Sequence, residues 1–77
     1  PALESEINKS LHTRINKKGI EGLASTHEIY GVIHEENKEL INALHANNLP
    51  EFRAELMDVL IACYVGLLSI DSKTIDW

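Results

Sequence analysis

Acidic residues in the middle of the chain have the types and spacing of a metal site. Two pairs stand at i,i+3 spacing, Glu36 with Glu39 and Glu55 with Asp58. On a helix this spacing puts both members of a pair on one face, about one turn apart. Carboxylate oxygens are the ligands that the hard cations Mg²⁺ and Mn²⁺ prefer. If the two pairs met, their repulsion would be relieved by a cation bound between them.

The segment between the two pairs predicts how they meet. Residues 47–50 read Asn-Asn-Leu-Pro, which indicates a turn between two helices. Glu39 and Glu55 are equally far along the chain from position 47, and so are Glu36 and Asp58. An antiparallel pair of helices would therefore bring Glu39 level with Glu55 and Glu36 level with Asp58.

A solvated acidic surface is the alternative interpretation of these residues, and it fits two of them poorly. Glu36 is flanked by apolar positions on its predicted helix, and Asp58 lies on an otherwise apolar helix. A lone carboxylate buried there would cost several kcal/mol or would stay protonated. The pattern therefore favours a metal site. Glu35 lies on the polar flank of the same helix. It could activate water or orient a ligand, or it could be an exposed charge paired with Lys38.

Length, charge and cysteine content limit the class of protein. The 77 residues make one small domain, residues 1–77, and the net charge of −5 argues against nucleic-acid binding. The single cysteine fits a reducing compartment, and the first residues lack the features of a signal peptide. The apolar run 56–70 contains Asp58 and is too short to span a bilayer. We expect a cytoplasmic protein without a membrane partner.

Hydrophobic periodicity and capping signals predict three helices, over about residues 3–18, 25–45 and 50–70, with a linker at 19–24. Ser25 followed by Glu28 is typical of a capping box, and Pro50 is tolerated in a first helical turn. The third helix is apolar around most of its circumference, with Cys63 read as a core residue. Two short helices can hardly cover it. The predicted fold is all-α: an antiparallel helical hairpin plus an N-terminal helix, assembling as a homodimer or homotetramer into a helix bundle.

The order Glu-Glu-x-x-Glu, fifteen residues, Glu-x-x-Asp resembles the signature of the MazG-like, all-α nucleoside triphosphate pyrophosphatase superfamily. The segments 34–40 and 55–61 are similar to its two motif helices, including the apolar run after the aspartate. The resemblance covers about residues 25–71. It implies a Mg²⁺-dependent hydrolase that converts a nucleoside or deoxynucleoside triphosphate to the monophosphate and pyrophosphate, with a role in nucleotide-pool house-cleaning. The oxygen ligands would also accept Mn²⁺.

The resemblance also implies roles for individual residues. The metal ligands would be Glu36, Glu39, Glu55 and Asp58, and Glu35 would be a catalytic or supporting acid. Many relatives place a phosphate-binding lysine one turn before each acid pair, where this chain has Val32 and Glu51. The phosphate charge would then be met by cations elsewhere in the chain or on a neighbouring subunit. The candidates for phosphate binding are Arg14, Lys17 and Lys38, with Lys18 and Arg53 as further possibilities.

Two rival functions remain open from the sequence. A non-catalytic relative would keep the acids but serve as a helical oligomerisation or interaction module, and the missing lysines favour it. A di-iron carboxylate protein is the other rival. That class uses Glu-x-x-His pairs, and neither acidic motif here ends in histidine.

Overall fold

The computed structural model describes residues 1–18, 23–72 and 74–77, and this part of the chain is all-α. The helices are α1 (Ala2–Lys18), α2 (Thr26–His45) and α3 (Leu49–Ser72). They agree with the three predicted helices to within two residues at each end. Residues 19–22 of the predicted linker lie outside the described residues.

The start of α2 is fixed by the predicted cap. Ser25 has an extended backbone, and its Oγ accepts a hydrogen bond of 3.1 Å from the backbone N–H of Glu28. The Glu28 carboxylate in turn accepts from the N–H of Ala24, at 2.7 Å, rather than from that of Ser25. Two backbone donors at the helix start are thus satisfied locally, which sets where α2 begins.

The turn between α2 and α3 is shorter than the sequence predicted. Asn47 adopts a positive φ of 53°, and its N–H donates to the Leu44 carbonyl. The N–H of Asn48 donates to the Ala43 carbonyl at 3.2 Å. These two bonds form a Schellman motif with asparagine in the left-handed position.

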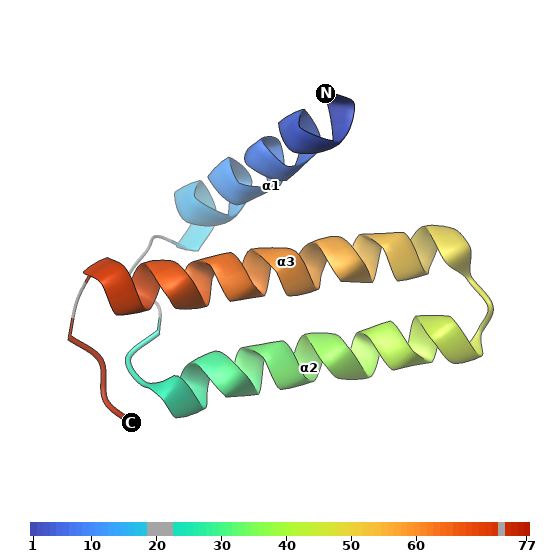
Figure 1. Ribbon diagram of the computed structural model, residues 1–77. Coiled ribbons are helices and arrows are strands. Elements are labelled where there is room, and N and C mark those ends of the chain that lie inside the picture. The colour runs from blue at the N-terminus through green and yellow to red at the C-terminus, as the bar shows by residue number, and fades with distance from the viewer. Residues whose placement is uncertain (19–22, 73) are drawn as a thin grey trace.

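The same turn starts α3 at once. The side-chain oxygen of Asn48 accepts from the N–H of Glu51 at 3.1 Å, which makes Asn48 the N-cap. Pro50 therefore lies in the first turn of α3, as predicted, and α3 begins one residue earlier, at Leu49. Because the connection is so short, α2 and α3 run in opposite directions side by side (Figure 1).

Small residues line the contact between α2 and α3. Besides Glu55, the buried residues of these two helices are Ala43 from α2 and Ala62, Val65, Gly66 and Ser69 from α3. At Gly66 an added Cβ would stand only 2.7 Å from Cγ2 of Ile29. The two backbones therefore approach closely, which also shortens the distance that side chains must bridge between the helices.

The opposite face of α3 carries large apolar side chains that this chain does not cover. The exposed fractions of Leu60 and Leu67 are 40% and 62%. Cys63 lies among them and is exposed, so its assignment to the core was wrong. The reason is that α3 turns its small residues and carboxylates toward α2. We call the exposed set the outer face of α3: Leu56, Leu60, Cys63, Tyr64, Leu67 and Ile70.

Helix α1 packs on α3 (Figure 1). Both guanidinium NH groups of Arg53 donate to the Glu6 carboxylate at 2.8 Å, which ties the first half of α1 to α3. Leu11 is buried in this contact region. No helix in the described part of the chain combines the length and apolarity that crossing a bilayer requires.

Candidate metal centre

Four carboxylates from two helices converge at one depth between α2 and α3. Each of Glu36, Glu39, Glu55 and Asp58 places an oxygen within 4.8 Å of an oxygen of the other three. We call these four residues the acidic cluster. The i,i+3 spacing stacks each pair along one helix face, and the tight turn sets the two pairs level. The structure thus brings together all four predicted metal ligands.

The members of the acidic cluster differ in burial. Glu55 is only 8% exposed and Glu36 is half-buried, whereas Glu39 and Asp58 are open to solvent. The Oε2 atoms of Glu36 and of Glu55 are buried and have no hydrogen-bond partner. Buried polar atoms in native proteins nearly always have a hydrogen-bond partner or a metal ligand bond. The described side chains provide no such partner for these two oxygens, which is consistent with a bound cation.

Three carboxyl groups in the cluster have raised pKa values. Hydrogen bonding with the Glu51 side chain, followed by burial and by Glu39 and Asp58, raises the pKa of Glu55 to about 7. Burial raises the pKa of Glu36, with the charges of Asp58 and Glu39 adding to it. Burial also raises the pKa of Asp58, together with the charge of Glu39. Without a cation the cluster therefore favours uptake of protons.

The donor set fits a hard divalent cation. Two oxygens on opposite sides of Mg²⁺, each at about 2.1 Å, are about 4.2 Å apart. The 4.8 Å spread of the cluster is close to that separation. Carboxylate oxygens from helices make a rigid ligand set, and a cation would meet both orphaned oxygens, on Glu36 and Glu55. The cluster thus offers suitable ligands at a suitable spacing.

Glu51 is a neighbour of the cluster that the sequence did not indicate as part of the site. Its side chain is exposed, but it lines a pocket next to the turn together with Glu39 and Glu55. A hydrogen bond between two carboxyl groups requires a proton on one of them, which explains why Glu51 affects the pKa of Glu55. The signal for this contact was the i,i+4 spacing of Glu51 and Glu55 on α3.

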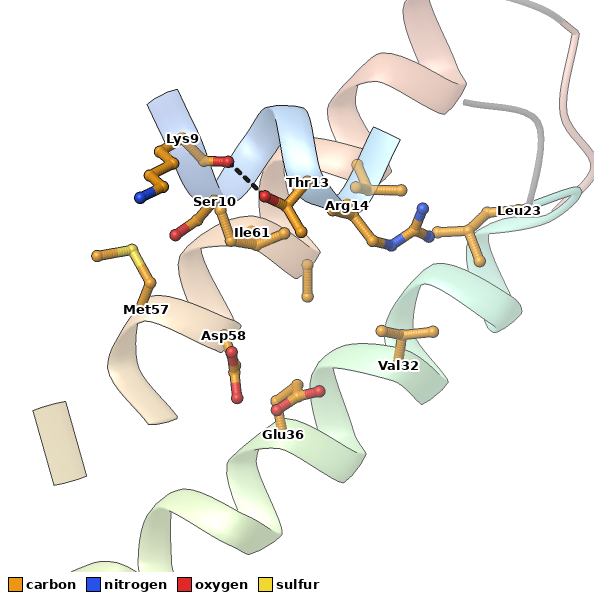
Figure 2. Close-up of a pocket in the computed structure, with 12 residues that line it drawn as sticks. Lys9, Ser10, Thr13, Arg14, Leu23, Val32, Glu36, Met57, Asp58 and Ile61 are labelled. Carbon is orange, nitrogen blue, oxygen red and sulfur yellow. Dashed lines mark hydrogen bonds between the residues drawn. The ribbon is translucent and has the colours of Figure 1, made fainter. Parts of the chain in front are cut away.

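Two residues of the acidic cluster, Glu36 and Asp58, line a pocket between α1 and the other two helices. The pocket has a volume of about 490 Å³, within the range of small-molecule sites. Figure 2 shows the carboxylates of Glu36 and Asp58 on one side and the polar side chains of α1 on the other. The residues from α1 are Lys9, Ser10, Thr13 and Arg14; the apolar lining is Leu23, Val32, Met57, Ile61, Ala62 and Val65.

The three cations predicted to bind phosphate are placed differently. Arg14 lines the pocket. Lys17 is exposed on α1 and is not among the lining residues. Lys38 lies on the solvent side of α2, 3.7 Å from Glu35, and both side chains are largely exposed. The structure therefore does not bring Lys17, Lys38 or Glu35 into the pocket. Lys9 does line it and was missed, because the sequence does not show which face of α1 turns toward α3.

Comparisons of the chain with models of protein families, with curated proteins and with solved structures found no match.

Proposed function

We propose that this protein is a Mg²⁺-dependent nucleoside triphosphate pyrophosphohydrolase of the MazG-like type, with Mn²⁺ able to replace Mg²⁺. The reaction joins water to a nucleoside or deoxynucleoside triphosphate and releases the monophosphate and pyrophosphate. The observation that carries the proposal is the convergence of four carboxylates within 4.8 Å, two of them with orphaned buried oxygens. Bringing these charges together without a cation costs free energy, which favours a bound cation as the reason for the arrangement.

The roles of the residues follow from their positions. Glu36, Glu39, Glu55 and Asp58 would hold the cation, and Glu36 and Asp58 present it to the adjoining pocket. A bound divalent cation neutralises phosphate charge and lowers the pKa of an attacking water. The pocket takes the substrate, and its apolar lining excludes water from the sugar and base. As the resemblance implies, the cleaved bond would be the anhydride between the α and β phosphates.

Of the two roles that the resemblance implies for Glu35, catalytic or supporting, we propose the supporting one. Its carboxylate lies beside Lys38 on the exposed side of α2, away from the pocket. We therefore expect Glu35→Gln to lower turnover much less than Glu39→Gln does.

The proposal includes assembly of the helices into an oligomeric bundle, as a homodimer or homotetramer. An uncovered apolar face of this extent on one helix is typical of a protein–protein interface. The outer face of α3 supports this part of the proposal. The single cysteine of the sequence suits a reducing compartment, in keeping with the proposal of a cytoplasmic protein.

The same outer face favours one rival function, a non-catalytic helical interaction module. Such a module would use the outer face of α3 to bind its partner and would keep the acidic cluster without turnover. The two functions differ in a direct measurement, the release of pyrophosphate.

The test is a screen of the purified protein against common and modified nucleoside triphosphates, with and without Mg²⁺. The proposal predicts Mg²⁺-dependent pyrophosphate release that Glu39→Gln and Asp58→Asn abolish while the protein stays folded. Glu4→Gln and Asp71→Asn are matched controls, because they make the same chemical changes at exposed positions outside the cluster. Full activity in both cluster variants would refute the assignment of these acids, and no release from any triphosphate would favour the interaction module.

A further inference from the structure

The pocket beside the acidic cluster has walls of opposite charge. Glu36 and Asp58 lie on the wall formed by α2 and α3, and Lys9 and Arg14 lie on the wall formed by α1. Between the two cations on α1 are the hydroxyl groups of Ser10 and Thr13 (Figure 2). An anionic ligand would be repelled by the acids alone, so it requires both a cation on the acids and positive charge opposite them.

We infer that α1 supplies the phosphate-binding wall of this pocket, with Arg14 and Lys9 binding the phosphate chain of a nucleotide whose other side is held at Glu36 and Asp58. This inference rests on the proposed function, because it takes the pocket to be the substrate site. Many MazG-like relatives have phosphate-binding lysines at the positions of Val32 and Glu51. In this chain, α1 would supply the missing positive charge. The inference also adds Lys9, which the sequence alone did not indicate.

The two cations would act in different ways. Arg14 is half-buried, and its side chain runs along the pocket toward Leu23 (Figure 2). A guanidinium group in such a position can bind two phosphate oxygens at once. Lys9 is exposed at the other edge of the pocket, above Met57. Its flexible four-carbon stem allows the ammonium group to turn over the opening as a point charge.

The wall is held to α3 by a contact outside the pocket, and a second contact lies within the wall itself. Arg53 on α3 binds Glu6 one turn before Lys9, through two bonds of 2.8 Å. The hydroxyl of Thr13 donates to the Lys9 carbonyl at 2.9 Å, within α1. The Glu6–Arg53 pair thereby helps to fix the position of α1 relative to α3, and so relative to Asp58.

The pocket lining indicates how the rest of a nucleotide would be recognised. Aliphatic residues and Met57 make up its apolar part, and no aromatic side chain is among the lining residues that the structure describes. A base would therefore find no ring on which to stack. Recognition led by phosphate predicts similar affinity for triphosphates of the four common bases, and competition by inorganic tripolyphosphate.

The test is calorimetric titration of a non-hydrolysable α,β-imido nucleoside triphosphate, in the presence of Mg²⁺, into the full chain and its variants. We expect Lys9→Gln and Arg14→Gln each to weaken binding about tenfold, because each removes a charge-assisted contact. Lys9→Arg keeps the charge and is expected to retain most of the affinity. Lys17→Gln is the matched control on the same helix, since Lys17 lies outside the pocket.

The outcomes separate this inference from the proposed function. If the unmodified protein releases pyrophosphate while Lys9→Gln and Arg14→Gln bind the analogue as tightly as it does, the α1 wall is refuted and the hydrolase stands. If the analogue binds in a Lys9- and Arg14-dependent way but no triphosphate is cleaved, phosphate binding by α1 is supported and the proposed hydrolase activity is refuted. No binding of either the analogue or tripolyphosphate refutes the wall. Thermal melts of each variant show whether a loss of binding reflects a loss of folding.

Discussion

The two faces of α3 differ in a way that reverses the usual distribution of side chains. The inner face, toward α2, carries small residues and the carboxylates Glu55 and Asp58. The outer face carries leucines, a tyrosine and an isoleucine that the chain leaves in contact with solvent. Large apolar residues are ordinarily the ones buried, because burying each one stabilises the fold by about 1.5–3 kcal/mol. The difference indicates that close helix approach and a charged site define the inner face, whereas the outer face leaves large apolar side chains uncovered, and we propose that another chain covers them.

The largest expected effect is a change of oligomeric state after substitutions on the outer face of α3. Leu60→Lys combined with Leu67→Lys should convert an oligomer to monomers, because two charges would be buried without partners in the interface. Size-exclusion chromatography with light scattering measures the mass directly. Leu3→Lys is the control, an exposed leucine on α1 outside this face. A monomeric unmodified protein would show that the outer face has a different use.

On the inner face, we expect a single added methyl group at Gly66 to lower the free energy of unfolding. In Gly66→Ala the new Cβ would stand 2.7 Å from Cγ2 of Ile29, so that either this side chain or the two helices must shift. We expect a loss of about 1–3 kcal/mol in the free energy of unfolding, as for other overpacked cores. Chemical denaturation measures it.

Gly31→Ala provides the matched control for this prediction. Gly31 lies on α2 with nothing within 4 Å of an added Cβ. Alanine there should stabilise the helix by about 0.5–1 kcal/mol, because glycine is the poorer helix former. Equal effects at Gly66 and Gly31 would mean that the helices do not approach closely at Gly66.

The smallest of the three effects is a dependence of stability on pH. The pKa of Glu55 is raised to about 7, above its value in the unfolded chain, so the folded state binds protons more tightly. Without metal, the free energy of unfolding should fall as the pH rises from about 5 to 8. Added Mg²⁺ should remove most of this fall, and so should Glu55→Gln. Thermal melts at several pH values, with EDTA or with Mg²⁺, measure both effects; a flat profile in EDTA would contradict the crowding of the cluster.

The sequence predicted some of these features for identifiable physical reasons. Ser25 and Glu28 marked the start of α2 because local hydrogen bonds decide where a helix begins. The convergence of the carboxylates followed from the equal spacing of the two acid pairs about the Asn47 turn. Both depend on residues close together in sequence or related by one short turn.

Other features depend on tertiary packing and were not visible in the sequence. Because α3 is apolar around most of its circumference, periodicity alone did not show which face turns inward, and Cys63 was placed in the core. Gly66 and Ala62, which permit close approach, were the better signal for that face. The place of Lys9 on the pocket depends on how α1 packs on α3, which the distant Glu6–Arg53 pair helps to set.

The central claim, that the acidic cluster binds a divalent cation, is tested most directly by titrating Mn²⁺ into metal-free protein and counting bound ions by electron paramagnetic resonance. The account predicts saturable binding that Mg²⁺ displaces and that Glu55→Gln weakens by at least about tenfold, since Glu55 supplies a buried oxygen with no other partner. Binding that is absent at millimolar Mn²⁺, with or without nucleotide, or that is unchanged in Glu55→Gln, would contradict it.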